Sequence, residues 1–246
     1  MNSTFYSNLH LPLNAIDQRN NPPLHFLWVQ DGCILMTGAL WTAAYVLYIR
    51  QGFKDRSYGM PLVPLCFNIG WEFAYGVLYP LSVAETLTFV PWLLIDAGIV
   101  YTTIQYGPEQ WKHAPVVAQN IKPLLGLGIA FSLVVHWAFI ETVGSVDDAG
   151  LWSGFGCQFL LGTSSVAQIM ARGNTGGHSW KIWLFRGLGT SFAVTMFSWR
   201  YWFYPESYPL VGSPMAILLF VCVEVVDLIY PFVYSSIASR EKVKSQ

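Results

Sequence analysis

Seven long apolar segments constrain this chain more than any other feature of its sequence. Each segment approaches the roughly 20 residues that an α-helix needs to cross the hydrocarbon core of a bilayer. The segments cover residues 29–49, 60–80, 88–106, 121–140, 152–171, 181–203 and 214–237. The connections between them are short, so we expect no inserted soluble domain. The sequence therefore predicts an all-α fold, a bundle of seven transmembrane helices.

The low charge content agrees with a membrane protein. Charged residues make up 11% of the chain, whereas soluble proteins average about 25%, and 54% of the residues are hydrophobic. The formal net charge of −1 gives no sign of a nucleic-acid partner. We expect a polar N-terminal segment at residues 1–28, a transmembrane domain at 29–237 and a basic tail at 238–246. We expect no cleavable signal peptide, because the first 28 residues lack a basic start followed by an apolar core.

Positive charges predict the orientation of the chain, because cytosolic loops carry an excess of lysine and arginine. They lie close to the ends that follow the first, third, fifth and seventh segments, at Arg50, Lys54, Arg56, Lys112, Lys122, Arg172, Lys181, Arg186, Arg240, Lys242 and Lys244. The opposite connections are acidic, with Glu85, Glu141, Asp147, Asp148 and Glu206. We therefore expect a multi-pass protein of the endoplasmic reticulum, with a lumenal N-terminus and a cytosolic C-terminus. A glycosylation sequon, Asn2-Ser3-Thr4, falls on the predicted lumenal side.

Several chemistries lack their sequence signatures. No CxxC pair joins the four cysteines, which we interpret as buried free thiols: Cys33, Cys66, Cys157 and Cys222. The chain has neither an HExxH zinc motif nor an aspartate-rich DDxxD motif for magnesium and diphosphate, so we expect no metal and no cofactor. The stretch from Arg172 to His178 lacks the GxxxxGK[ST] phosphate-binding pattern and predicts a flexible cytosolic turn.

Four acidic residues lie well inside the predicted helices: Glu72, Asp96, Glu224 and Asp227. Ionisable groups inside a membrane are costly and usually functional. At a helical rise of about 1.5 Å per residue, all four lie roughly 12–20 Å from the lumenal helix ends. They therefore share one layer of the predicted bundle.

Helical spacing places these acids on defined faces. Asn68, Glu72 and Tyr75 share a face of the second helix, and Glu224 and Asp227 share a face of the seventh. If the two faces meet, they enclose a polar cavity with aromatic walls. We predict Glu72 and Asp227 as the catalytic acids of such a cavity, with Glu72 preferred as the proton donor. We expect a further set of residues around the substrate: Asn68, Trp71, Tyr75, Asp96 and Glu224.

Structural roles are open alternatives for some of these polar residues. Asp96 could simply hydrogen-bond a neighbouring helix, since polar side chains join helices within membranes. Glu224 could pair with Arg200 or support a catalytic group without touching substrate. We interpret His136 as a packed, hydrogen-bonded histidine.

Two motifs carry a resemblance to a known family: Asn68-Ile-Gly-Trp-Glu-Phe-Ala-Tyr-Gly76 and Glu224-Val-Val-Asp-Leu-Ile-Tyr-Pro231. With them, the chain resembles the fungal integral-membrane terpene cyclases of meroterpenoid and indole-diterpene pathways, such as those that make pyripyropene, terretonin, austinol, andrastin and paxilline. The resemblance covers essentially the whole chain. In that family a glutamate of helix 2 and an aspartate of helix 7 are implicated in catalysis, and they match Glu72 and Asp227.

The resemblance implies a reaction as well as a fold. It implies a metal-free cyclase of the isomerase or lyase class that acts in secondary metabolism. The substrate would be a lipophilic epoxyprenyl compound held in membrane lipid, either an epoxyfarnesyl meroterpenoid or an epoxygeranylgeranyl indole. The chemistry of the residues agrees, because burial favours a neutral carboxyl group, which can donate a proton to the epoxide oxygen. Aromatic faces would stabilise the carbocation through cation–π attraction.

A function of another class is the alternative: a seven-helix transporter or receptor for a lipophilic metabolite. Acids inside a membrane also serve proton-coupled transport. The sequence disfavours this alternative, because it shows no inverted-repeat signal of the kind that many transporters carry.

Overall fold

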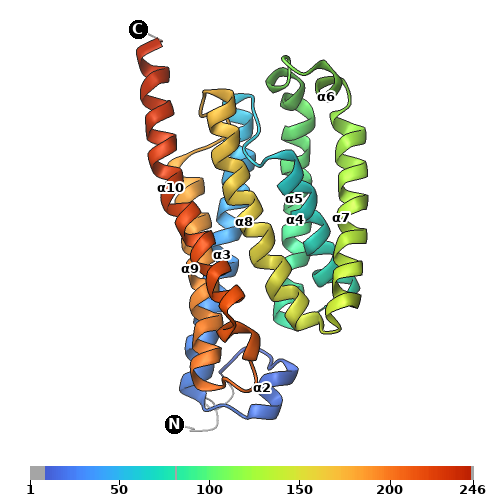
Figure 1. Ribbon diagram of the computed structural model, residues 1–246, viewed down its shortest axis with the longest axis vertical. Coiled ribbons are helices and arrows are strands. Elements are labelled where there is room, and N and C mark those ends of the chain that lie inside the picture. The colour runs from blue at the N-terminus through green and yellow to red at the C-terminus, as the bar shows by residue number, and fades with distance from the viewer. Residues whose placement is uncertain (1–8, 81, 245–246) are drawn as a thin grey trace.

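The computed structural model describes residues 9–80 and 82–244 of the chain. Figure 1 shows an elongated bundle of helices that run roughly along its long axis. Within the described residues the chain forms no strand, which confirms the predicted all-α class. The elements are, in order, α2 (Ala15–Asn20), α3 (Leu24–Asp55), α4 (Leu62–Phe73), the π-helix η1 (Ala74–Leu78), α5 (Val83–Gln110), α6 (Pro115–Gln119), α7 (Ile121–Val143), α8 (Val146–Arg172), α9 (Trp180–Phe203), the 3-10 helix η2 (Pro209–Gly212) and α10 (Pro214–Lys244).

Helices cover all seven predicted apolar segments, but they differ in how apolar they are. Four of them, α3, α5, α7 and α10, are long and apolar enough to cross a membrane. α4 and η1 together make a shorter apolar helix, Leu62–Leu78. α8 and α9 are long enough to cross a membrane but are more polar. α9, for example, carries three basic residues: Lys181, Arg186 and Arg200. The described residues therefore give four candidate membrane spans.

Side chains and glycines mark where the long helices begin and end. Ser82, Ser145 and Ser179 each accept a hydrogen bond from a backbone N–H in the first turn of α5, α8 and α9, respectively. Such caps satisfy amide groups that have no partner inside the helix. Gly144 and Gly173 follow α7 and α8 with positive φ angles of 74° and 62°, which glycine adopts without steric cost. These signals keep the connections between neighbouring helices short.

The connections lie at two opposite ends of the bundle. Figure 1 shows α2, the turn between α7 and α8, and the connection from α9 to α10 at one end, which we call the α2 end. The other end carries α6, the loop between α8 and α9 and the C-terminal end of α10, and we call it the α6 end. Long helices that follow one another in the chain therefore run in opposite directions.

Helix packing separates the two helices that were expected to form the cavity. α3 packs along α9, α4 along α7, and α8 along α10. α8 also contacts α4, so it lies between α4 and α10. The face that carries Glu72 therefore does not meet the face that carries Asp227 directly, and the picture of two facing helices is wrong. The reason is that residues of α8 fill the space between them.

The outer faces of the long helices expose large apolar side chains. Leu94 is 70% exposed, Phe131 62% and Phe232 76%, although each lies in the middle part of its helix. A soluble protein rarely exposes so much contiguous apolar surface, whereas lipid tails match it. These surfaces therefore agree with helices that contact a bilayer.

Three smaller predictions have mixed outcomes. Cys33 and Cys66 are buried free cysteines, but Cys157 and Cys222 are free and only partly buried. The loop expected to be a flexible turn is instead held in place, because the Gly177 N–H donates to Asp55 and Thr175 donates to Glu241. Residues Asn2, Ser3 and Thr4 of the glycosylation sequon lie outside the described residues.

Candidate active site

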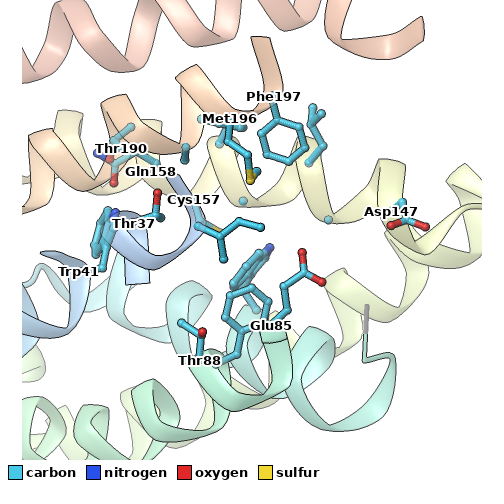
Figure 2. Close-up of a pocket in the computed structure, with 18 of the residues that line it drawn as sticks. Thr37, Trp41, Glu85, Thr88, Asp147, Cys157, Gln158, Thr190, Met196 and Phe197 are labelled. Carbon is cyan, nitrogen blue, oxygen red and sulfur yellow. The ribbon is translucent and has the colours of Figure 1, made fainter. Parts of the chain in front are cut away.

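A cavity opens between α3, α4, α5, α8 and α9 and extends toward the α2 end. Figure 2 shows Glu85 and Asp147 toward one end of it, with Trp41, Gln158 and Thr190 toward the other. Its polar lining gathers in two places. The α2 end supplies Asn14, Glu85, Asp147, Asp148, Arg200 and Ser207, and the deep end supplies Tyr45, Asn68, Glu72 and Gln158. The wall between them is mostly apolar.

Aromatic rings form a connected wall beside the deep end. The Trp71 and Phe89 ring centroids lie 4.6 Å apart with their planes at 63°. Phe89 contacts Trp92 at 5.6 Å, and Trp92 contacts Tyr45 at 5.6 Å. Trp41 completes the series against Tyr45 at 5.7 Å. All five rings line the cavity, so a ligand there would meet ring faces and edges more than water.

Glu72 lies at the deep wall of this cavity with no surface exposed to water. Its Oε1 accepts hydrogen bonds from the Tyr45 hydroxyl at 2.8 Å and from the Asn68 amide at 3.0 Å. Its Oε2 has no hydrogen-bond donor among the described residues. The expected pairing of Asn68 with Glu72 at i and i+4 is therefore confirmed. The cavity wall thus contains a carboxyl group that has one oxygen held and one without a donor.

Asp96 lies behind Glu72 and does not line the cavity. It comes from α5 and is fully buried. The Asn68 amide nitrogen lies 2.9 Å from its Oδ2 and also contacts Glu72. One amide side chain therefore holds two acids from neighbouring helices, as the structural alternative for Asp96 described.

Asp227 has a different partner, the fully buried Arg186 of α9, with which it forms an ion pair. The Arg186 guanidinium also lies 5.5 Å from the centroid of the Tyr230 ring. The Gln158 amide donates to Oδ2 of Asp227 at 3.2 Å, and Gln158 lines the cavity whereas Asp227 does not. Asp227 therefore contacts the cavity wall through Gln158. No hydrogen bond joins Asp227 to Glu72 in the described part of the chain.

Tyr75 is another predicted site residue that lies outside the cavity lining. The Tyr75 hydroxyl accepts a hydrogen bond from Ser153 of α8 at 3.0 Å, and the ring is fully buried. Trp71 does line the cavity and donates to the same serine at 3.0 Å. Tyr75 lies one helical turn after Trp71, with the two ring centroids 5.2 Å apart, so both residues meet Ser153 of α8.

Glu224 does not pair with Arg200, so that alternative is wrong. The Ser191 hydroxyl lies 3.0 Å and 3.1 Å from the two Glu224 carboxyl oxygens. Arg200 instead donates from Nε to Gln30 at 2.8 Å, at the α2 end. Arg200 binds Gln30 and not Glu224 because α3 lies along α9, which brings Gln30 next to the arginine.

Three functional candidates escaped the sequence analysis: Tyr45, Gln158 and Arg186. Each is a polar residue with apolar neighbours within a long helix, which is the signal that singled out the four acids. The pattern of positive charges places Arg186 with the cytosolic residues, although it lies about one and a half turns inside the segment 181–203. His136 is buried, and its Nε2 lies 3.3 Å from the backbone oxygen of Phe67, as its packed interpretation expected. No cluster of three or more metal-binding side chains occurs within residues 9–80 and 82–244.

Known proteins resemble this chain over almost its whole length. A family model described as Pyr4-like transmembrane terpene cyclases matches residues 16–240. The chain is 54% identical over 239 residues to the Pyr4-family terpene cyclase mfmH of Annulohypoxylon moriforme, which covers 97% of this chain and 99% of the relative. The chain belongs to the Pyr4-like transmembrane terpene cyclases. The terpene cyclase macJ of Penicillium terrestre is 35% identical over 232 residues, 92% of this Pyr4-like chain and 89% of the relative.

Membership of this family confirms the resemblance that the two motifs carried. The matched residues of this Pyr4-like chain run from α2 to α10, so nearly the whole cavity lies within the matched part. The family and the apolar helices together identify an integral membrane protein. No solved structure matches this chain significantly.

Proposed function

We propose that this chain is a terpene cyclase that protonates the terminal epoxide of a lipophilic epoxyprenyl substrate and cyclises its polyene chain. An epoxyfarnesyl meroterpenoid is the substrate class we favour. The observation that carries the proposal is Glu72, a fully buried carboxyl group at the deep wall of an aromatic cavity. Relatives named terpene cyclases along almost the full chain support the reaction class.

We also propose that all seven long helical segments lie in the membrane of the endoplasmic reticulum, with a lumenal N-terminus and a cytosolic C-terminus. The alternation of the connections between the two ends of the bundle supports this topology. The basic connections after α3 and α8 fall at the α6 end, and the acidic first turns of α5 and α8 fall at the α2 end. The positive-inside tendency then assigns the α6 end to the cytosol.

The proposed first step is transfer of a proton from Glu72 to the epoxide oxygen. The O–H bond of Glu72 breaks, and its electron pair stays on the carboxylate. The C–O bond of the epoxide opens as the nearest double bond attacks the carbon, so positive charge moves into the polyene. The Tyr45 and Asn68 donors on Oε1 would stabilise the carboxylate that forms.

The proposed role of the aromatic wall is to guide the cation. A developing carbocation over the faces of Trp41, Trp71 or Trp92 gains about 2 kcal/mol when water is excluded. A polyene held in a folded shape also loses less entropy on the way to the transition state. The cascade ends when a C–H bond beside the last cation releases its proton. One proton is taken and one is released, so the reaction needs no other reactant.

We propose that Asp227 acts as an anion rather than as the proton donor. Its ion pair with Arg186 supports this role, because a guanidinium beside a carboxyl group favours the charged form. The anion would fix the Gln158 amide at the cavity wall. In this proposal Glu72 donates the proton, and Asp227 supports the reaction as a fixed negative charge behind the cavity wall.

The test is turnover of defined substrates by purified membranes that contain this chain. A panel of epoxyprenyl compounds with different head groups and chain lengths should give cyclic products from at least one class, and the same compounds without the epoxide should not react. Reaction in detergent, where no gradient exists, would separate catalysis from the transporter alternative. Cyclisation by a Glu72→Gln variant at the wild-type rate would overturn the assignment of the donor.

A further inference from the structure

Two carboxyl groups share one buried site in this bundle. Glu72 and Asp96 have no exposed surface, and the Asn68 amide binds one oxygen of each. The remaining oxygens, Oε2 of Glu72 and Oδ1 of Asp96, have no other hydrogen-bond donor in the described residues. The Asn68 amide nitrogen lies 3.0 Å from Oε1 of Glu72 and 2.9 Å from Oδ2 of Asp96, so the two carboxyl groups are close neighbours. Two neighbouring carboxyl groups can hydrogen-bond to each other only if one of them carries a proton.

The groups around this pair supply no positive charge. Tyr45 approaches from α3, Asn68 from α4 and Cys157 from α8, and all of them are neutral. On α7, the His136 ring is bound to a backbone oxygen and contacts the Tyr75 ring. Within the described residues, neither acid takes part in a salt bridge. Two adjacent anions in an apolar interior without a cation are strongly disfavoured.

We propose that Asp96 is a protonated acid that donates a hydrogen bond to Oε2 of Glu72 and thereby stabilises the Glu72 carboxylate formed during catalysis. The inference rests on the proposed function, in which Glu72 gives its proton to substrate. Asp96 lies behind the cavity wall and touches no substrate, so it is a positioning residue.

The proton balance is simple. Before the reaction, each of the two acids holds one proton. Glu72 loses its own proton to the substrate, and Asp96 keeps its proton on the bond to Oε2. The new carboxylate then has donors on both oxygens: the Tyr45 hydroxyl and the Asn68 amide on Oε1, and Asp96 on Oε2. The proton released at the end of cyclisation equals the one consumed.

A purely structural role for Asp96 makes a different prediction. If Asp96 only joins α5 to α4, it needs one oxygen to accept from Asn68, and an ionised carboxylate would do this at least as well. The two roles therefore differ in the protonation state of Asp96 at neutral pH. That state can be measured without substrate.

Infrared difference spectroscopy of the full-length protein in lipid provides the measurement. Protonated carboxyl groups absorb in a C=O stretching band that shifts in D₂O, and carboxylates do not contribute to it. Asp96→Asn should remove intensity from this band at neutral pH. Asp227→Asn is the matched control, because Asp227 is the anion of an ion pair and its removal should leave the band unchanged. An Asp96→Asn spectrum with the full wild-type band would overturn the proposal.

Enzyme kinetics give a second, independent readout. Asp96→Asn keeps an N–H that can donate to Glu72, so its kcat should stay within about threefold of wild type, and its pH profile should not move to lower pH. If Asp96 were ionised, its replacement would remove a negative charge beside Glu72 and shift the pH profile of kcat to lower pH. Such a shift would therefore show that Asp96 is ionised. Asp96→Leu has no donor, and its kcat should fall by about 10- to 100-fold with little change in KM. Wild-type kcat in Asp96→Leu would overturn the proposal, whereas wild-type turnover in Glu72→Gln would overturn the proposed function instead.

Discussion

The bundle holds two buried acid sites that are built in opposite ways. Glu72 and Asp96 come from α4 and α5, and their hydrogen-bond partners are the Asn68 amide, shared by both acids, and the Tyr45 phenol, which binds Glu72. Asp227 comes from α10 and is paired with the guanidinium of Arg186. The first site lies at the cavity wall, and the second lies behind Gln158. In the roles proposed above, the carboxyl groups of the first site hold protons because no cation is near, whereas Asp227 is a fixed negative charge beside Arg186.

The largest effect is expected from neutralising each acid in turn. Glu72→Gln should lower cyclisation by about 10²- to 10⁴-fold, the usual contribution of a general acid. It should leave the melting temperature in detergent almost unchanged, because a neutral amide replaces a neutral acid of the same shape. Asp227→Asn should lower both activity and melting temperature, because it leaves Arg186 as an unpaired buried charge.

Glu109→Gln is the control for this first comparison, since Glu109 is exposed at the end of α5 and pairs only with Lys112. The measurement is product formation in microsomes together with thermal unfolding of the purified variants. If Glu72→Gln proved as destabilised as Asp227→Asn, the contrast between the two sites would be lost.

The next effect concerns the stability of the ion pair itself. Arg186→Met should cost about 3–5 kcal/mol of folding free energy, because the Asp227 anion would stay buried without its partner. The double variant Arg186→Met with Asp227→Leu should recover much of this loss, since a well-packed apolar pair is often as stable as a buried ion pair. The experiment is a double-mutant cycle on unfolding in detergent. Additive losses in the cycle would show that the two residues do not interact.

A smaller effect is expected at Gln158, which connects the ion pair to the cavity. Gln158→Leu removes the hydrogen bond to Asp227 without touching the charges. One hydrogen bond to a charged group contributes about 1.5–3 kcal/mol, so the rate of cyclisation should fall by roughly 10- to 100-fold if the bond holds the wall in its catalytic form. The kinetics should be compared with Gln158→Glu, which keeps the length of the side chain but places a second negative charge near Asp227. Full activity in Gln158→Leu would show that Asp227 does not act through this residue.

The sequence predicted the parts of the site that lie on one helix. Glu72 stood out as an acid in an apolar run, and its spacing from Asn68 placed the two on one face, where they now form a 3.0 Å hydrogen bond. The partners from other helices could not be predicted in this way. Tyr45 and Asp96 meet Asn68 only because α3 and α5 pack beside α4. No periodicity within a single helix contains that information.

Local geometry limited the prediction in a second way. Helical spacing put Tyr75 on the face of Glu72, but Tyr75 also lies one turn after Trp71, and both residues bind Ser153 of α8. For Arg186 the limit was its position near the end of a predicted segment, where a basic residue is usually explained by the cytosolic side. Its pairing with Asp227, 41 residues later in the chain, depends on how α9 and α10 pack.

The smallest expected effect tests whether the groups around the ion pair of Arg186 and Asp227 keep the same charge when the pH changes. His178 lies in the loop between α8 and α9, and its Nδ1 is 3.1 Å from the hydroxyl of Tyr230, whose ring contacts Arg186. Burial, together with the positive charges of Arg172 and Arg186, lowers the pKa of His178 to about 3 from its ordinary value of 6.5. The folded protein therefore keeps this side chain neutral at every pH at which the unfolded chain begins to take up a proton.

The sign of the pH effect follows from this difference. Below about pH 6.5 the unfolded chain binds a proton that folded His178 does not, so stability falls as the pH falls. Between pH 7 and pH 6 the loss should be about 0.7 kcal/mol, and it should be absent in His178→Gln, which cannot titrate. Unfolding in detergent at the two pH values, for both proteins, measures it. An equal loss in His178→Gln would assign the pH effect to other groups, and would remove the support for a region of constant charge around Asp227.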